Sequence, residues 1–328
     1  MAHSLSAAAV SALAAVTILI GASEPAIAQT YPARPVRVIV PQPPGGGTDI
    51  VGRVISDQVG RQLGQQFFVE NRTGGGTVVG TDAAAKSAPD GYTLVVGLNA
   101  NMAVNPSLFS KLPYDPVKDF TPVAMIVTFP FLVVVNNDLP VKSVAELIAL
   151  AKSKPGKINF ASAGNGTGQH LSMELFKLLT GTHFVHVPYR GAQAAYPDLI
   201  SGQVPVFFDN IAAALPHAKS GRVRAIAVTT AQRSPLAPDV PTVSESGLPG
   251  FEYHTWFGVW APAATPRSIV EKLNAEVEKA LATPEVRERL TGQGGEPSTM
   301  KLAQIEPFVK AEIVKWAKVV KEAGVKVD

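Results

Sequence analysis

The first half of the chain alternates short apolar runs with glycine-rich loops. The run Val-Arg-Val-Ile-Val at 36–40 predicts a buried strand, because β-branched residues are typical of strands. The following residues, 41–48, include three prolines and three glycines and end that strand. Apolar residues then recur at helical spacing from Ile50 to Leu63, which predicts a helix with Thr48 or Asp49 as its N-cap. Further strands are predicted at 67–69 and 92–96, with a second glycine loop at 74–76 between them.

The second half repeats this order of elements. A strand is predicted at 131–135, and an amphipathic helix at 144–152 is preceded by Ser143 with Glu146 at the capping-box spacing. A strand at 158–162 runs into the glycine loop 163–168, and a helix with Leu171 and Leu175 on one face follows. Three more strands are predicted at 184–187, 204–208 and 224–228, and two helices at 268–281 and 305–323.

Two successive sets of strand, glycine loop and helix predict an α/β protein with two lobes that face each other. We expect lobe 1 to begin with residues 29–125 and lobe 2 to comprise 126–251. Residues 252–328 would cross back and add C-terminal helices, mainly to lobe 1. The chain would cross between the lobes near 124–128 and 251–258. No repeat of fixed period indicates a solenoid.

The N-terminal residues have the pattern of an export signal. An apolar, small-residue run from Ser6 to Ile20 precedes Ala26-Ile27-Ala28, the small-x-small pattern of a signal-peptidase site. A run of about 15 residues is shorter than the roughly 20 that span a bilayer. We therefore predict a signal peptide at 1–28, cleaved after Ala28, and a periplasmic product. Because no Lys or Arg precedes the run, a retained membrane anchor is the alternative.

Composition narrows the function classes. A hydrophobic content of 46% with 17% charged residues indicates a folded globular protein. The net charge of +3 comes without a basic cluster interleaved with aromatics, so nucleic acid is not expected as a partner. The chain has no cysteine, which excludes disulfides, thiol catalysis and cysteine-bound zinc. We predict no cofactor and no metal.

Motifs for catalysis and nucleotide binding are absent from the sequence. No Gly-Lys-[Ser/Thr] triplet closes a glycine loop, and the third glycine of Gly164-Asn-Gly166-Thr-Gly168 comes one residue too early for a dinucleotide fingerprint. No G-x-S-x-G or H-E-x-x-H motif occurs. A serine–His170–Asp209 arrangement remains conceivable, although the sequence gives it no geometry, so a hydrolase is kept as a rival function.

Anion capture is the function that glycine loops before helices favour. A helix N-terminus offers unpaired N–H groups and a partial positive charge, and glycine lets the backbone approach a ligand. Such loops can hold a carboxylate without Lys or Arg. The alternative is that the loops are only tight turns.

Read together, the motifs resemble the Bug-type solute receptors of tripartite tricarboxylate transporters, over nearly the whole mature chain. The stretches that carry the resemblance are Val40-Pro41 to Asp49, Val69-Glu70-Asn71-Arg72, Ala88 to Leu94, Leu112 to Pro116, Asp119 to Val123, Ser162 to Thr167 with His170-Leu171, Val187 to Gly191, Asp198-Leu199, Gly202-Gln203, Phe208-Asp209, Pro262 and Thr265-Pro266. Each stretch alone is weak, but their number and order are specific.

The resemblance implies a two-lobed type II periplasmic-binding-protein fold, in which one carboxylate of the ligand is pinched between loops 45–49 and 162–167. The implied ligand-binding residues are Gly46, Gly47, Thr48 and Asp49 on the first loop, Ser162, Gly166, Thr167 and His170 on the second, and Asn101, Tyr189 and Asp209 elsewhere. Asp209 would position water or a ligand amino or hydroxyl group. As alternatives, Asp49 caps its helix, His170 packs or braces its loop, and Tyr189 buries its ring.

Two positions depart from the family pattern. Gln42 stands where these receptors often carry an aromatic or small apolar residue, and Gly74-Gly75-Gly76-Thr77 replaces a Pro-Gly-Ala-Gly-Gly-type loop. Both places, together with 99–102 and 128–131, are expected to influence ligand choice.

The resemblance thus implies a monomeric, non-enzymatic periplasmic receptor that delivers a small organic carboxylate to membrane transporter subunits. A receptor that presents its ligand to a membrane sensor kinase is the alternative.

Overall fold

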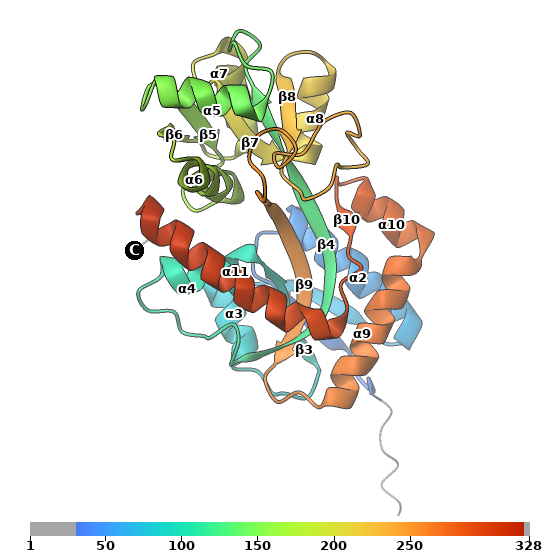
Figure 1. Ribbon diagram of the computed structural model, residues 1–328. Helices are drawn as coiled ribbons and strands as arrows, with labels where there is room; N and C mark the ends of the chain where they lie inside the picture. Colours follow the sequence, from blue (N-terminus) through green and yellow to red (C-terminus); the bar gives the residue numbers. More distant parts are fainter. Residues whose placement is uncertain (1–30, 325–328) are drawn as a thin grey trace, which may run out of the picture. The chain divides into compact units, whose positions relative to one another are not determined.

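Two β-sheets share one long strand in the part of the chain that the computed structural model describes, residues 31–324 (Figure 1). This strand, β4, spans Phe120–Val135. Its residues 120–130 pair with β9 (His254–Pro262), whereas residues 131–135 pair with β7 and β8. β4 therefore belongs to both sheets, and each sheet is the centre of one lobe. The predicted signal peptide, residues 1–28, lies outside the described residues.

The sheet of lobe 1 has the strand order β2-β1-β3-β9-β4-β10. Its parallel strands are β1 (Val36–Val40), β2 (Phe67–Asn71) and β3 (Thr93–Leu98). β9 runs antiparallel to β3 and β4, and the short β10 (Glu296–Pro297) is antiparallel to β4. The helical segments of this lobe are α2 (Gly47–Leu63), α3 (Val78–Ala85), the π-helical turn η1 (Ala100–Val104), α4 (Asn105–Leu108), α9 (Arg267–Ala282), α10 (Pro284–Thr291) and α11 (Leu302–Ala323).

The sheet of lobe 2 has the order β8-β4-β7-β5-β6. β5 (Asn159–Ser162) is parallel to β6 (Val185–Pro188) and to β7 (Val206–Asn210), while β8 (Arg224–Val228) and β7 are antiparallel to β4. The helices are α5 (Val144–Ser153), α6 (Gly168–Thr180), the short 3-10 turn η2 (Ala192–Ala195), α7 (Tyr196–Ser201) and α8 (Ile211–Lys219).

The alternation of side chains along β4 explains how lobe 2 is packed. Leu132 and Val134 lie in one buried cluster with residues of α7 and α8. Val133 and Val135 point to the other face and join a cluster with residues of α5 and α6. Because successive strand residues face opposite sides, one apolar run fills the core on both faces of the sheet.

Loops at the carboxyl ends of parallel strands position the site. The chain leaves β1, β2 and β3 into 41–46, 72–77 and η1, and it leaves β5 into 163–167 before α6. In open α/β sheets, ligands bind outside the carboxyl ends of the strands. α11 crosses from lobe 1 towards lobe 2 and packs against both η1 and α6 (Figure 1).

Most predicted elements are confirmed, with two exceptions. The predictions at 224–228, 268–281 and 305–323 correspond to β8, α9 and α11. The sequence predicted only 131–135 of β4 and no strand at the position of β9, whereas β4 begins at Phe120 and His254–Pro262 forms a strand. The predicted helix start at Ser143 is confirmed, since its hydroxyl accepts the N–H of Glu146 at 3.2 Å.

Within residues 31–324, no helix combines the length and the apolar character needed to cross a bilayer.

Candidate ligand-binding site

A cavity of about 570 Å³ is lined by residues of both lobes. Lobe 1 contributes from the loops after β1 and β2, from η1, α4 and β9, and from α11; lobe 2 contributes the start of α6 and its preceding loop. The lining residues are Gln42, Gly75, Gly76, Thr77, Leu98, Asn99, Ala100, Val104, Asn105, Leu108, Phe109, Asn165, Gly166, Thr167, Gly168, Gln169, Leu171, Tyr253, Thr255, Phe257 and Trp316. The volume lies within the range of about 300–1,000 Å³ that is usual for small-molecule sites.

The N-terminus of α6 forms one wall of this cavity. Thr167 is the N-cap, and its hydroxyl donates to the carbonyl of Gly164 at 2.7 Å. Across residues 31–324, the N–H groups of Gly168 and Gln169 find no acceptor. Both residues line the cavity. Uncommitted N–H groups at the positive end of a helix suit an anion.

The loop 74–77 forms a second wall with the same property. Four successive residues have left-handed backbone, with φ values of 134°, 52°, 60° and 81° from Gly74 to Thr77. Glycine supports this conformation at 74–76, whereas Thr77 holds it as a strained residue. In the described chain, nothing accepts the N–H groups of Gly75, Gly76 and Thr77. This wall therefore presents a second set of backbone donors.

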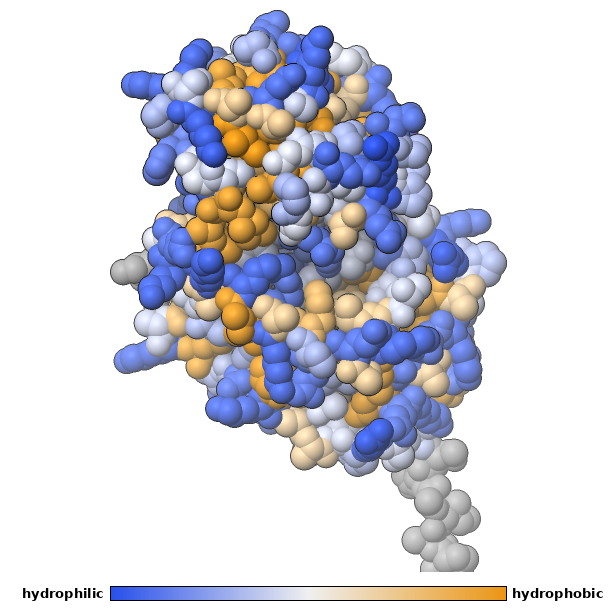
Figure 2. All heavy atoms as spheres, viewed as in Figure 1, coloured by the Kyte–Doolittle hydropathy of each residue, from blue (hydrophilic) through white to orange (hydrophobic). Residues whose placement is uncertain are grey.

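Aromatic and aliphatic side chains cover the rest of the cavity. Tyr253 packs edge-on against Phe131, with ring centroids 4.9 Å apart, and against Trp316 at 5.7 Å. The indole N–H groups of Trp316 and Trp256 both donate to the buried carboxylate of Glu312, at 3.0 and 3.2 Å. Figure 2 shows hydrophobic residues gathered over α6 beside α11. No Lys, Arg, His, Asp or Glu is among the described residues that line the cavity.

The predicted first loop lies at the start of α2, and one neighbour of it reaches the cavity. Gly46 and Gly47 are exposed, and the N–H groups of Gly46, Gly47 and Thr48 have no acceptor in the described part of the chain. The Thr48 hydroxyl donates to the side-chain oxygen of Gln42, which lines the cavity. The loop is thus joined to the cavity through Gln42.

The predicted N-cap of α2 was wrong. The helix begins at Gly47, and Gly46 is its N-cap without a side-chain hydrogen bond. Asp49 instead reaches back from the first turn, where its carboxylate accepts from Gly45 N–H at 2.9 Å, Arg53 at 3.0 Å and Asn71 at 2.9 Å. Burial raises the pKa of Asp49, but the bonds from Arg53, Gly45 and Asn71 outweigh it and leave the pKa below its ordinary value. Asp49 therefore braces the loop as an ionised carboxylate.

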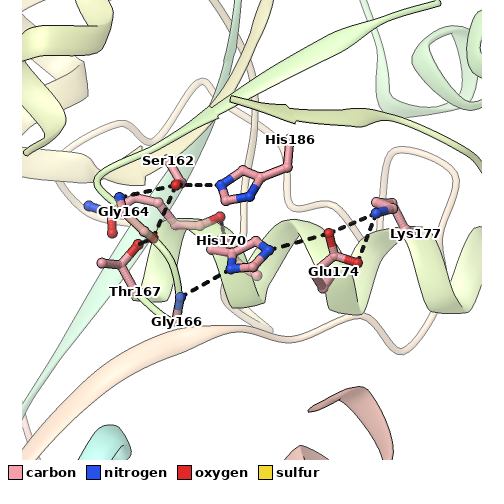
Figure 3. A network of polar contacts seen from close by, with 10 residues as sticks. Ser162, Gly164, Gly166, Thr167, His170, Glu174, Lys177 and His186 are labelled. Carbon is pink, nitrogen blue, oxygen red and sulfur yellow. Dashed lines mark hydrogen bonds and ion pairs between the residues drawn. The ribbon is translucent and has the colours of Figure 1, made fainter. Parts of the chain in front are cut away.

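Ser162 and His170 lie directly behind the loop 163–167 (Figure 3). Ser162 is fully buried, and its hydroxyl lies 2.6 Å from Nε2 of His186. The His170 ring stacks on that of His186 with centroids 3.8 Å apart, and its Nδ1 accepts the N–H of Gly166 at 3.1 Å. His170 thus braces the loop from behind.

Charged groups extend this network along α6. Nε2 of His170 lies 3.6 Å from the carboxylate of Glu174, which also pairs with Lys177 at 2.7 Å (Figure 3). Burial and then the nearby His170 lower the pKa of His186 to about 4. His186 is therefore neutral at neutral pH.

Asp209 is fully buried and reaches the cavity through one intermediate side chain. Its carboxylate accepts from Gln169 Nε2 at 3.0 Å, from the Tyr196 hydroxyl at 2.8 Å and from Asn210 N–H at 2.8 Å. Burial raises the pKa of Asp209 despite these bonds. The hypothetical serine–His170–Asp209 arrangement does not form. His170 contacts Gly166 and Glu174, whereas Asp209 contacts Gln169 and Tyr196.

The remaining two candidates lie outside the cavity lining. Asn101 is fully buried in η1, where its side chain accepts Leu98 N–H at 2.8 Å and donates to the Thr81 hydroxyl at 3.0 Å. The Tyr189 hydroxyl donates to Asp198 at 2.6 Å, and burial followed by Asp198 raises its pKa to about 12.

Sequence reasoning did not find several lining residues. Gln169 follows the predicted loop directly, so its position beside Gly168 was an available signal. Tyr253, Thr255 and Trp316 gave none, because an aromatic residue on a strand or on an amphipathic helix has the pattern of ordinary core.

A two-lobed α/β fold with loop N–H groups around a cavity between the lobes is typical of solute-binding receptors. The chain matches the model of the tripartite tricarboxylate transporter family receptor over residues 51–325. It is 42% identical over 307 residues to Protein BugT of Bordetella pertussis (strain Tohama I), covering 93% of this chain and 94% of that protein. The protein therefore belongs to the tripartite tricarboxylate transporter receptor family.

Solved structures agree with this assignment. Rpa4515 of R. palustris, solved with adipate, is 38% identical with a TM-score of 0.75, and the match covers 90% of this chain and all of that one. MatC (Rpa3494) from Rhodopseudomonas palustris, solved with bound malate, is also 38% identical with a TM-score of 0.72, over 88% of this chain and all of that one. The predicted two-lobed periplasmic-binding-protein fold and the family resemblance are confirmed.

Proposed function

We propose that this protein is a non-enzymatic receptor that captures a small organic carboxylate in the cavity between its lobes. One observation carries the proposal: the residues of two cavity walls, 75–77 and 168–169, carry backbone N–H groups without an acceptor in residues 31–324. The bound adipate and malate of the two related structures support a carboxylate as the ligand class.

Backbone donors suffice energetically. A hydrogen bond to a charged group contributes roughly 1.5–3 kcal/mol, and micromolar binding needs about 8 kcal/mol. Two or three such bonds from each wall reach that value after ordering costs. Gly166 and Thr167 shape the α6 wall, and the free N–H groups of Gly46, Gly47 and Thr48 add a third set when the lobes close.

We assign supporting roles to the other candidates. Asp49, Ser162 and His170 fix the loops whose N–H groups hold the carboxylate, and Asn101 fixes the turn after β3. Tyr189 holds the segment after β6 through Asp198. Closure would bend β4 and the chain entering β9, because these segments connect the lobes.

The family of the protein supports a role in delivering the bound ligand to a membrane transporter. We propose that the chain is exported to the periplasm, cleaved after Ala28, and passes its ligand as a monomer to transporter subunits in the membrane. The family model describes a transporter receptor, which favours transport over presentation to a sensor kinase.

The test is a calorimetric and thermal-shift screen with mono-, di- and tricarboxylic, amino and aromatic acids. A ligand at about 100 times its dissociation constant should stabilise the fold by about 2.7 kcal/mol. Thr167→Val should weaken binding at least tenfold, since the hydroxyl that fixes Gly164 is lost. Thr291→Val on α10 is the matched control, because its exposed hydroxyl bonds only within its own helix.

Wild-type affinity in folded Thr167→Val would count against the α6 wall. Chemical conversion of a bound acid would contradict the non-enzymatic assignment, and no shift with any acid would contradict carboxylate capture.

A further inference from the structure

Gln169 combines two properties that determine how it meets a ligand. Its side chain is half-buried in the cavity wall, and its Nε2 donates to Asp209 Oδ1 at 3.0 Å. Within the described residues, its side-chain oxygen Oε1 has no hydrogen-bond partner.

Asp209 fixes which end of the Gln169 amide faces the cavity. All three contacts of its carboxylate come from donors, namely Gln169, Tyr196 and Asn210 N–H. Oδ1 of Asp209, the atom that Gln169 contacts, also accepts the N–H of Asn210 and is therefore an acceptor, so the amide NH₂ of Gln169 points towards it. The acceptor Oε1 is then left for the cavity side.

Neighbouring polar side chains are wholly or partly bonded to other groups of the protein. Asn99 donates to the carbonyl of His254 and accepts the N–H of Trp256. The amide nitrogen of Asn105 donates to Gly76 and Thr77, and the Thr167 hydroxyl to Gly164. Within the described residues, Oδ1 of Asn105 is also without a hydrogen bond, but Oε1 of Gln169 is an acceptor on the same helix turn as the free N–H groups of Gly168 and Gln169.

An acceptor oxygen repels a carboxylate and attracts a donor. The N–H groups of Gly168 and Gln169 are suited to bind an anionic group of the ligand, whereas Oε1 of Gln169, on the same helix turn, requires an O–H or N–H donor from the ligand. A ligand carrying both groups satisfies the wall completely, and a buried acceptor without a donor costs binding energy.

We propose that Gln169 is a specificity-determining residue that selects carboxylates bearing a hydroxyl or amino group, with Asp209 as the residue that positions it. This inference rests on the proposed capture of a carboxylate, and it adds the chemistry of the group beside that carboxylate.

Pairs of acids that differ by one donor test the inference. Dissociation constants are measured by calorimetry for malate against succinate, 2-hydroxyglutarate against glutarate, lactate against propionate, and aspartate against succinate. We expect the member with the donor to bind about fivefold to tenfold more tightly in the preferred pair, as one added hydrogen bond predicts.

Variants assign this preference to Gln169. Gln169→Met keeps the length of the side chain without the amide and should remove most of the preference. The dissociation constant of the acid without the donor group should change less than that of the acid with it. Asp209→Ala should reduce the preference by releasing the amide. Tyr196→Phe is the matched control, because it removes one donor to Asp209 and keeps the Asp209–Gln169 bond, so the preference should persist.

Three outcomes separate the possibilities. Equal affinities within every pair for the wild type would overturn the inference and leave carboxylate capture standing. A preference that survives folded Gln169→Met would assign the selection to another residue and also overturn it. Failure of all acids to bind would contradict the proposed function itself.

Discussion

Replacing Gly168 with alanine tests how closely α6 approaches β9 at the cavity. A Cβ atom at this position would lie 2.4 Å from the hydroxyl oxygen of Tyr253, 3.1 Å from Cζ of Phe131 and 3.5 Å from Oγ1 of Thr255. Tyr253 and Phe131 are 2% and 3% exposed, so neither ring can move into solvent. Gly168 has no left-handed φ, and the cost therefore comes from overlap with Tyr253, which precedes β9, and with Phe131 of β4.

The expected loss is moderate. Overpacking a buried position costs about 1–3 kcal/mol, and alanine regains up to about 1 kcal/mol through its helix propensity. We expect the free energy of unfolding to fall by about 1–2 kcal/mol, which lowers the Tm by about 2–8 °C in a protein of this size. Ligand affinity should fall too, because the N–H of residue 168 moves with the helix.

Urea unfolding followed by circular dichroism measures the change. Gly47→Ala is the stability control, because its Cβ meets nothing within 4 Å and its φ is not left-handed. That variant should keep or slightly raise the free energy of unfolding. If Gly168→Ala is as stable as Gly47→Ala, the close approach of α6 to Tyr253 is refuted.

Three further predictions concern stability. Burial, followed by the charge of His170, lowers the pKa of His186 to about 4, compared with 6.5 in the unfolded chain. The stability that neutral His186 contributes is therefore complete above pH 6.5 and is lost as the pH falls through 4. The loss of unfolding free energy is about 1–2 kcal/mol after allowance for the partial exposure of His186. The unfolding free energy of the His186→Gln variant should vary less between pH 4 and 7 than that of the wild type. The same pH dependence in both proteins would disprove the assignment to His186. Glu312→Ala leaves the buried indole N–H groups of Trp256 and Trp316 without an acceptor. We expect the free energy of unfolding, measured with urea, to fall by about 2–5 kcal/mol, and a loss under 1 kcal/mol would contradict this role of Glu312. Asn101→Ala should cost about 1–3 kcal/mol, because Leu98 N–H loses its acceptor, whereas the Thr81 hydroxyl loses the bond from Asn101 but still donates to the carbonyl of Thr77. A neutral result in the same assay would contradict this role of Asn101.

The sequence predicted elements well where one periodicity dominates. α9 and α11 have clear helical spacing, and β8 is a short β-branched run, so their positions follow from local pattern alone. β4 was predicted only in part because Pro122 and Pro130 interrupt it, and proline is unusual in a central strand. The structure accommodates Pro122 at a register shift against β9.

The loops of the site were predicted, but their partners were not. Glycine loops before α2 and α6 were visible in the sequence, because backbone approach needs glycine. Residues 75–77 and Gly168 line the same cavity because of how β2 and β5 are placed, and that placement depends on strand pairing over long sequence distances. The same is true of Asp209, whose connection to the cavity runs through Gln169 and is encoded in no local motif.

The aromatic wall has a spectroscopic consequence. The chain contains three tryptophans, and Trp316 lines the cavity while Trp256 shares its Glu312 acceptor and lies 5.8 Å from Trp260. All three indoles are almost fully buried, so their emission reports a desolvated environment. Because Trp316 lines the cavity, a bound acid would place a negative charge beside its indole, and we expect the intrinsic fluorescence of the unlabelled protein to change as the cavity fills.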